Sequence, residues 1–124
     1  MRLLLDTHAF LWWSDDAPQL RAEARQAIAA AEQVVVSVAS AWEAGIKAGA
    51  GKLALRVPFE EAVEINGFDK LLITFAHAAA VATLPRHHGD PFDRMLIAQA
   101  QVEGLVLVTH DRRFAPYGAA ILWT

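Results

Sequence analysis

Five short apolar runs constrain the fold of this chain more than any other feature. The runs are RLLL (2–5), VVVS (34–37), LLIT (71–74), LVLVT (105–109) and AAILW (119–123). Short runs that stay apolar, instead of alternating with polar residues, are typical of strands buried on both faces. They predict a mostly parallel sheet that is covered by helices on both sides.

The segments between these runs carry helical patterns. After Pro18, an amphipathic pattern continues to Gln33 and ends just before the VVVS run. The other expected helices cover residues 8–13, 38–51, 58–66, 75–84 and 91–103. Strands alternating with helices predict a single domain over residues 1–124, of the α/β class, folded as a three-layer α/β/α sandwich.

Composition narrows the class of protein. Hydrophobic residues make up 55% of the 124 residues and charged residues 20%, which indicates a globular domain with a sizeable core. The chain has no cysteine, so disulfides, thiolate metal sites and a cysteine nucleophile are excluded. We identify no signal peptide and no membrane-spanning run, so a cytoplasmic protein is the expectation. The net charge of −3 argues against a generally basic nucleic-acid-binding surface, although a local basic rim is compatible with it.

Acidic residues follow three of the predicted strands. Asp6 comes directly after the first, Glu43 lies in the helix after the second, and Asp111 comes two residues after LVLVT. Each has an ordinary structural interpretation as a helix cap, a solvated helix residue or a turn residue. Ligands of open parallel sheets, however, bind beyond the carboxyl ends of the strands, where these residues should gather.

A further acidic pair, Asp90 and Asp93, opens the helix that begins DPFDRMLIAQA. Asp before Pro is a favoured N-cap, and acidic groups in the first turn complement the helix dipole, so both residues have a structural explanation. The functional interpretation is that the first turn of this helix directs a carboxylate toward the edge of the sheet where the other acidic residues gather.

Gathered carboxylates repel one another and require a cation. Without cysteine, the expected cation is Mg²⁺, with Mn²⁺ as the alternative, because both prefer oxygen ligands. Such an ion activates water and stabilises a phosphate leaving group. The chain has no phosphate-binding glycine loop and no GxSxG, so hydrolysis of phosphodiester bonds is the best-supported chemistry.

Four stretches together resemble the PIN domain and, within it, the VapC toxins of bacterial toxin–antitoxin systems. They are MRLLLDTHAFLWW, SVASAWEAGIKAGAGKL, HHGDPFDRMLIAQA and LVLVTHDRRF, and they extend over nearly the whole chain. The resemblance implies a Mg²⁺-dependent endoribonuclease that forms a homodimer and is held inactive by an antitoxin protein.

The resemblance also implies a set of site residues. The four acidic positions of the family fall on Asp6, Glu43, Asp93 and Asp111 as metal-binding and catalytic residues. Asp90 is then a helper or only the N-cap of its helix, and we favour the cap. The family pattern Thr-Asn-Asp reads Thr109-His110-Asp111 here, which leaves the role of position 110 open, while the Thr109 hydroxyl is a possible helper near the metal.

Basic and aromatic residues surround these positions. Arg94, Arg112 and Arg113 are candidates for binding RNA phosphates, with Arg86, His87 and His88 nearby in sequence; a solvated surface is the alternative. A zinc site at His87-His88 is disfavoured because no second ligand pair follows.

Three further residues have open roles. His8 is expected to be a partly buried group of its helix, although it could also approach the site. Trp12 and Trp13 are adjacent and cannot easily both point inward, so one of them is a candidate for a protein interface.

Two other functions remain open at this stage. One is a PIN-type RNA-processing nuclease that has no antitoxin. The other is a non-catalytic PIN-like domain that binds RNA or protein; the four filled acidic positions argue against it.

Overall fold

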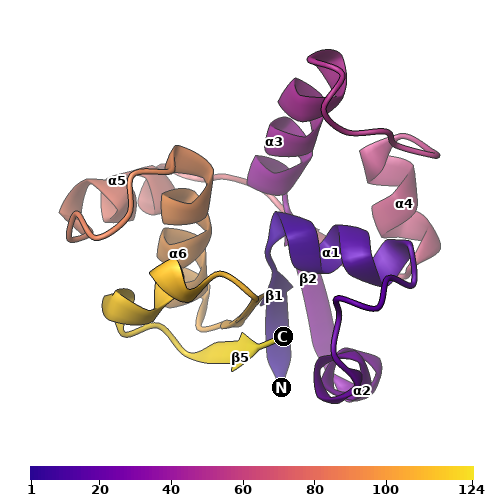
Figure 1. Cartoon of the computed structure of the whole chain (residues 1–124). Helices are drawn as coiled ribbons and strands as arrows, with labels where there is room; N and C mark the ends of the chain where they lie inside the picture. Colours follow the sequence, from indigo (N-terminus) through magenta and orange to yellow (C-terminus); the bar gives the residue numbers. More distant parts are fainter.

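Five strands pair in parallel, in the order β3-β2-β1-β4-β5, and four of them lie in the predicted apolar runs (Figure 1). The computed structural model describes residues 1–124. The strands are β1 (Arg2–Leu5), β2 (Gln33–Ser37), β3 (Asp69–Leu71), β4 (Val106–Thr109) and β5 (Ile121–Trp123). The helices are α1 (Thr7–Ser14), α2 (Ala22–Ala30), α3 (Val38–Gly49), α4 (Phe59–Ile65), α5 (Phe75–Thr83), α6 (Pro91–Glu103) and the 3₁₀ helix η1 (Arg112–Tyr117).

The order of the strands reverses direction at the centre of the sheet. The chain proceeds from β1 through β2 to β3 on one side, and later adds β4 and β5 on the other side. Leu5 therefore lies opposite Val36 on β2 and opposite Val108 on β4. In open parallel sheets the crevice at such a reversal, beyond the carboxyl ends of the strands, is where ligands bind.

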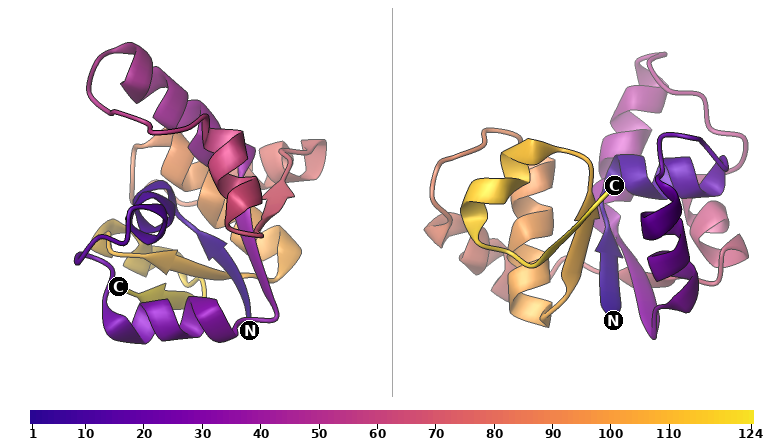
Figure 2. Two further views of the ribbon diagram at one scale, coloured as in Figure 1. Left: turned by 90° about the vertical axis from the view of Figure 1, so that its right-hand side faces the viewer. Right: turned by 60° about the horizontal axis from the view of Figure 1, so that its bottom comes forward.

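The sheet separates two hydrophobic cores. Leu3 and Leu5 pack into one core and Leu4 into the other, because successive side chains of a strand point to opposite faces. Figure 1 and the right-hand view of Figure 2 show α5 and α6 on one side of the strands and α1 and α2 on the other. The predicted α/β/α sandwich with a parallel sheet is confirmed. None of the helices has the length and apolar character needed to cross a membrane.

Several predicted element boundaries are wrong. The helix expected to continue to Gln33 ends at Ala30, since Gln33 already pairs in β2, and the helix expected to reach residue 51 ends at Gly49. Helix α2 begins at Ala22 instead of directly after Pro18, because residues 17–20 form a turn in which the N–H of Leu20 donates to the carbonyl of Ala17. The predicted strand at 71–74 lies earlier, at Asp69–Leu71, since Thr74 already caps α5 with its side chain. The last strand begins two residues later than predicted, at Ile121.

We predict that Leu96→Ala lowers the free energy of unfolding by about 2–5 kcal/mol, because the residue is fully buried in α6 and truncation leaves a cavity. Urea-induced unfolding measures the effect. Val102→Ala on the same helix is the matched control. Its side chain is 44% exposed, and we expect a change within about 0.5 kcal/mol. Equal losses for the two variants would contradict the assigned burial of α6.

Candidate active site

Asp6 lies at the junction between the central strand and the first helix. It follows β1 directly and caps α1, with Oδ1 accepting a hydrogen bond of 2.8 Å from the N–H of Ala9. Its Oδ2 accepts a bond of 2.6 Å from the hydroxyl of Thr109, at the end of β4. Helix α1 and strand β4 therefore hold this carboxylate, and the residue is almost completely buried.

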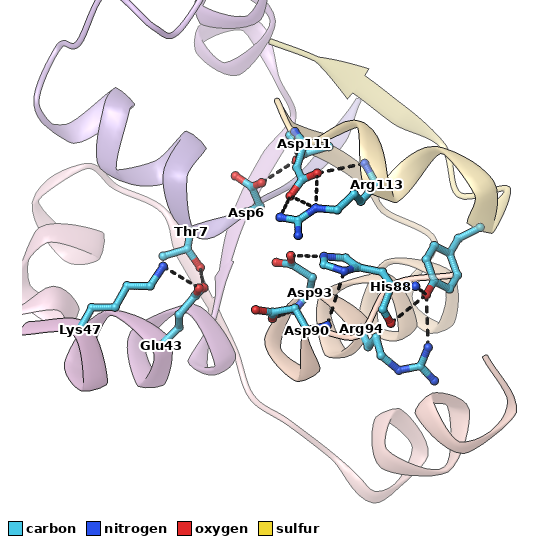
Figure 3. A network of polar contacts seen from close by, with 12 residues as sticks. Asp6, Thr7, Glu43, Lys47, His88, Asp90, Asp93, Arg94, Asp111 and Arg113 are labelled. Atoms are coloured by element: carbon cyan, nitrogen blue, oxygen red, sulfur yellow. Dashed lines mark hydrogen bonds and ion pairs between the residues drawn. The ribbon is translucent and has the colours of Figure 1, made fainter. Parts of the chain in front are cut away.

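Asp93 occupies the first turn of α6, which begins with Asp90 as its N-cap. Oδ1 of Asp90 accepts a hydrogen bond of 2.9 Å from the N–H of Asp93, so the predicted cap is confirmed. The side chain of Asp93 meets His88, with its Oδ2 2.7 Å from Nε2 of the imidazole, and the Asp90 carboxylate lies beside it (Figure 3). The start of α6 thus orients the Asp93 carboxylate, while Asp90 serves the backbone.

Asp111 closes the group from the side of β4. It caps η1, accepting a bond of 2.9 Å from the N–H of Arg113, and it pairs with the guanidinium of the same residue at 2.6 Å. One ligand atom each of His88, Asp93 and Asp111 lie within 4.8 Å of one another. Figure 3 shows Asp6 next to this group. The three carboxylates thus lie near one another at the reversal of the sheet.

Burial is the main electrostatic feature of the site. It raises the pKa of Asp6 to about 6, with smaller contributions from the charges of Asp111 and Glu43. Burial also raises the pKa of Asp93 to about 6, and the hydrogen bond from His88 partly offsets it. By contrast, the hydrogen bond from Arg113 holds the pKa of Asp111 below its usual range. Desolvation, more than mutual repulsion, is therefore what disfavours two ionised carboxylates here.

Glu43 lies to one side of this group. Its Oε1 accepts a hydrogen bond of 2.6 Å from the hydroxyl of Thr7, which also contacts Ser40 at 3.0 Å, and its Oε2 pairs with Lys47 at 3.0 Å. Figure 3 shows Glu43 with Thr7 and Lys47, apart from Asp93 and Asp111. Thr7 directly follows Asp6, so the hydrogen bond between Thr7 and Glu43 links Glu43 to the site.

A groove of about 400 Å³ runs past Asp6 and Asp111. Its remaining walls carry three rings and two guanidinium groups, from His8, Trp12, His110, Arg112 and Arg113. His8 is exposed, so the expectation that it is partly buried is wrong. Position 110, where the family pattern has Asn, holds a histidine whose Nδ1 lies 2.6 Å from the carbonyl oxygen of Thr124.

The three predicted phosphate-binding arginines differ in their surroundings. The guanidinium of Arg94 donates to the carbonyls of Val81, Leu84 and Pro85 and to the hydroxyl of Tyr117. Because these acceptors occupy it, Arg94 is a structural residue of the loop before α6, and we withdraw it from the predicted RNA-binding set. Arg112 and Arg113 are exposed at the groove.

Sequence reasoning missed the contacts of His88 and of Thr7. The backbone N–H of His88 donates to Tyr117 at 2.7 Å, which places its ring against Asp93. For the contact between His88 and Asp93, the only signal in the sequence is their spacing of five residues. Nothing local in the sequence indicated that Thr7 would face Glu43, since 36 positions separate them.

Comparison with known proteins identifies the family of the chain. The PIN domain family model matches residues 3–119. The chain is 35% identical to ribonuclease VapC22 of Mycobacterium tuberculosis, over 90% of this chain and 88% of that protein.

The fold is similar to that of several solved structures. One is a toxin–antitoxin complex from Klebsiella pneumoniae, with a TM-score of 0.67, 20% identity and coverage of 97% and 95%. The fold also matches VapBC2 of Rickettsia felis, crystallised with a promoter DNA fragment, with a TM-score of 0.70, 14% identity and 98% coverage of both chains. It matches FitAcB of Neisseria gonorrhoeae with a TM-score of 0.69, 20% identity and coverage of 97% and 96%.

We predict that Asp6→Asn stabilises the chain at pH 8 in EDTA by about 1–3 kcal/mol. The pKa of Asp6 in the folded chain, about 6, exceeds the ordinary value of 3.8. At a pH between these two values, the Asp6 carboxylate therefore takes up a proton when the chain folds. Wild-type stability therefore decreases as pH rises through this window, and the cost is complete above it. Asparagine carries no charge. Its Oδ1 can still accept from the N–H of Ala9, while its amide N–H donates to the Thr109 hydroxyl, so that the second bond reverses direction.

Urea-induced unfolding at pH 4 and pH 8 measures this difference, which should shrink at pH 4, where Asp6 is largely protonated. Asp15→Asn, at an exposed position after α1, is the control and should change stability at neither pH. A destabilised Asp6→Asn chain at pH 8 would mean that the hydrogen bonds to the carboxylate outweigh its desolvation.

Proposed function

The chain belongs to the PIN-domain family, and within it to the VapC ribonucleases, and from this premise we propose that it is a metal-dependent endoribonuclease. In this proposal Mg²⁺ or Mn²⁺ binds at Asp6, Asp93 and Asp111, and water hydrolyses a phosphodiester bond of RNA. The chain then acts as the toxin of a toxin–antitoxin pair.

The observation that carries the proposal is the cluster of Asp93, Asp111 and His88 at the reversal of the sheet, with the Asp6 carboxylate beside it. Two of these carboxylates are largely buried and have a raised pKa, so a bound cation would offset the cost of keeping them ionised. Their donors are oxygen atoms, which suit a hard divalent ion. The residues therefore fit the metal that the family implies.

In this mechanism some residues bind the metal ion and others orient those ligands. A divalent ion held there supplies an activated water and offsets negative charge on the phosphate. Asp6 and Asp93 would provide ligands, while Thr109 and His88 hold their orientation through hydrogen bonds. Glu43 is the fourth acidic residue of the family pattern, and its carboxylate reaches the site through the hydroxyl of Thr7.

RNA would approach along the exposed groove. Arg112 and Arg113 lie there beside the carboxylates. Arg113 pairs with Asp111 through Nε and Nη2, so its Nη1 and the exposed guanidinium of Arg112 are the groups that can bind RNA phosphates. The net charge of −3 makes this local basic rim, and not the whole surface, the element that attracts RNA.

An antitoxin and a second copy of the chain complete the proposal. The solved structures of similar fold include a toxin–antitoxin complex from Klebsiella pneumoniae, which supports an antitoxin protein as the regulator of this chain. Trp42, which is 61% exposed, packs edge to face against Phe92 and offers an apolar surface for a homodimer.

We predict that the purified chain cleaves RNA with Mg²⁺ or Mn²⁺, and that Asp6→Asn lowers the rate on the order of 100-fold or more. The loss follows from the central place of Asp6 between β1 and β4. Gel analysis of a pool of structured RNAs, with metal and with EDTA, measures cleavage.

Asp15→Asn is the matched control, because it removes one exposed carboxylate at the C-cap of α1, outside the site. It should cleave as the wild type does. Cleavage that survives both EDTA and Asp6→Asn would come from a contaminating ribonuclease, and a folded wild type that cleaves no RNA would argue against the proposed function.

We also predict that His88→Ala lowers the affinity for Mn²⁺ by about 10- to 100-fold, because Asp93 loses the hydrogen bond that orients it. His88→Gln should keep most of the affinity, since its amide N–H can replace Nε2–H. Isothermal titration calorimetry measures both variants. Equal affinities for wild type and His88→Ala would show that His88 does not orient Asp93.

A further inference from the structure

Three rings lie together in the groove beside the carboxylates. His8 and Trp12 are four residues apart on α1 and therefore share one face of the helix. Their ring centroids are 5.9 Å apart, and the ring of His110 meets Trp12 edge to face at 5.7 Å. His8 and His110 are exposed and Trp12 is half-buried between them, so a continuous aromatic surface faces solvent.

The tertiary structure holds these rings in place. His110 is fixed by its Nδ1, which lies 2.6 Å from the carbonyl oxygen of Thr124. Trp12 also packs against the core beneath α1. The neighbouring Trp13 points elsewhere, where its Nε1 donates to Asn66 at 3.0 Å and its ring packs on Phe68. Only one tryptophan of the pair therefore belongs to the groove.

Cationic and anionic groups line the same groove as these rings. Arg112 lies with its guanidinium carbon 4.2 Å from the centre of the Trp123 ring, which restricts its position beside the groove. Asp6 and Asp111 line the same groove of about 400 Å³. An aromatic face, a guanidinium group and the carboxylates thus lie within a single groove, in which a base and its phosphate can be bound together.

From this arrangement we propose that His8, Trp12 and His110 form a stacking surface for an unpaired RNA base next to the cleaved phosphodiester bond. The proposal rests on the proposed ribonuclease function and adds the class of substrate. A base within a duplex has both faces covered by its neighbours, whereas a base in a single strand or loop offers a free face to an aromatic ring. The chain therefore selects single-stranded RNA, with little preference for one base at this position.

The test measures binding of a short single-stranded RNA that contains the fluorescent base 2-aminopurine, in EDTA so that the RNA stays intact. Stacking quenches this base, so fluorescence reports stacking and anisotropy reports affinity. We expect Trp12→Leu to bind about tenfold or more weakly and to lose the quenching. Trp12→Phe should retain most of both, because it keeps a ring at the same place.

Two further variants separate stacking from folding. Trp13→Phe changes the adjacent tryptophan outside the groove and should bind as the wild type does. His8→Ala removes an exposed ring without disturbing the core, and it should weaken binding and quenching even if Trp12→Leu folds poorly. Circular dichroism and thermal unfolding verify the fold of each variant.

The proposal is overturned if wild type and His8→Ala bind and quench the RNA equally, or if wild type prefers duplex RNA. Absence of binding by the wild type also overturns it. The ribonuclease function is judged separately, by metal-dependent cleavage with wild-type protein and Asp6→Asn. Cleavage without any quenching would reject only the stacking surface, and quenching without cleavage would reject only the nuclease.

Discussion

The backbone N–H of Asp6 donates to the carbonyl of Val108 across the two central strands, at 3.0 Å. This bond extends the pairing of β1 with β4 by one residue beyond the strand, at the reversal of the sheet. It fixes the place where the chain leaves β1 and α1 begins. Since α1 begins with Asp6 as its cap, the same bond sets the position of the groove rings of α1 and of the Asp6 carboxylate.

The hydrogen bonds that cap three helices also position acidic residues at the site. Asp6, Asp90 and Asp111 each accept a hydrogen bond from the first turn of a helix that starts at this edge of the sheet. The structural and functional interpretations of these residues are therefore compatible. A capping carboxylate has one oxygen directed to the backbone, and its second oxygen is available for other contacts; in Asp6 it accepts from Thr109.

The loop before α6 depends on side chains that are distant in sequence. Arg94 bonds three carbonyls of the preceding segment and the hydroxyl of Tyr117, which in turn accepts the N–H of His88. Through these contacts η1, α5 and α6 together determine where His88 meets Asp93. An arginine that looked like a phosphate ligand in the sequence is instead part of the support of the site, because its planar group can serve several acceptors at once.

The sequence by itself determined the class of fold and the acidic positions, because strand burial and helix caps leave local patterns in runs such as VVVS and DPFDR. It misplaced α2 and β3, whose limits depend on a turn and on edge pairing that such patterns do not specify. Only the tertiary structure decided that Glu43 lies apart with Thr7 and Lys47, that His88 contacts Asp93, and that Trp12 and not Trp13 faces the groove. These outcomes are set by which side chains meet across the packed layers, and contacts between residues far apart in the chain leave no trace in local sequence.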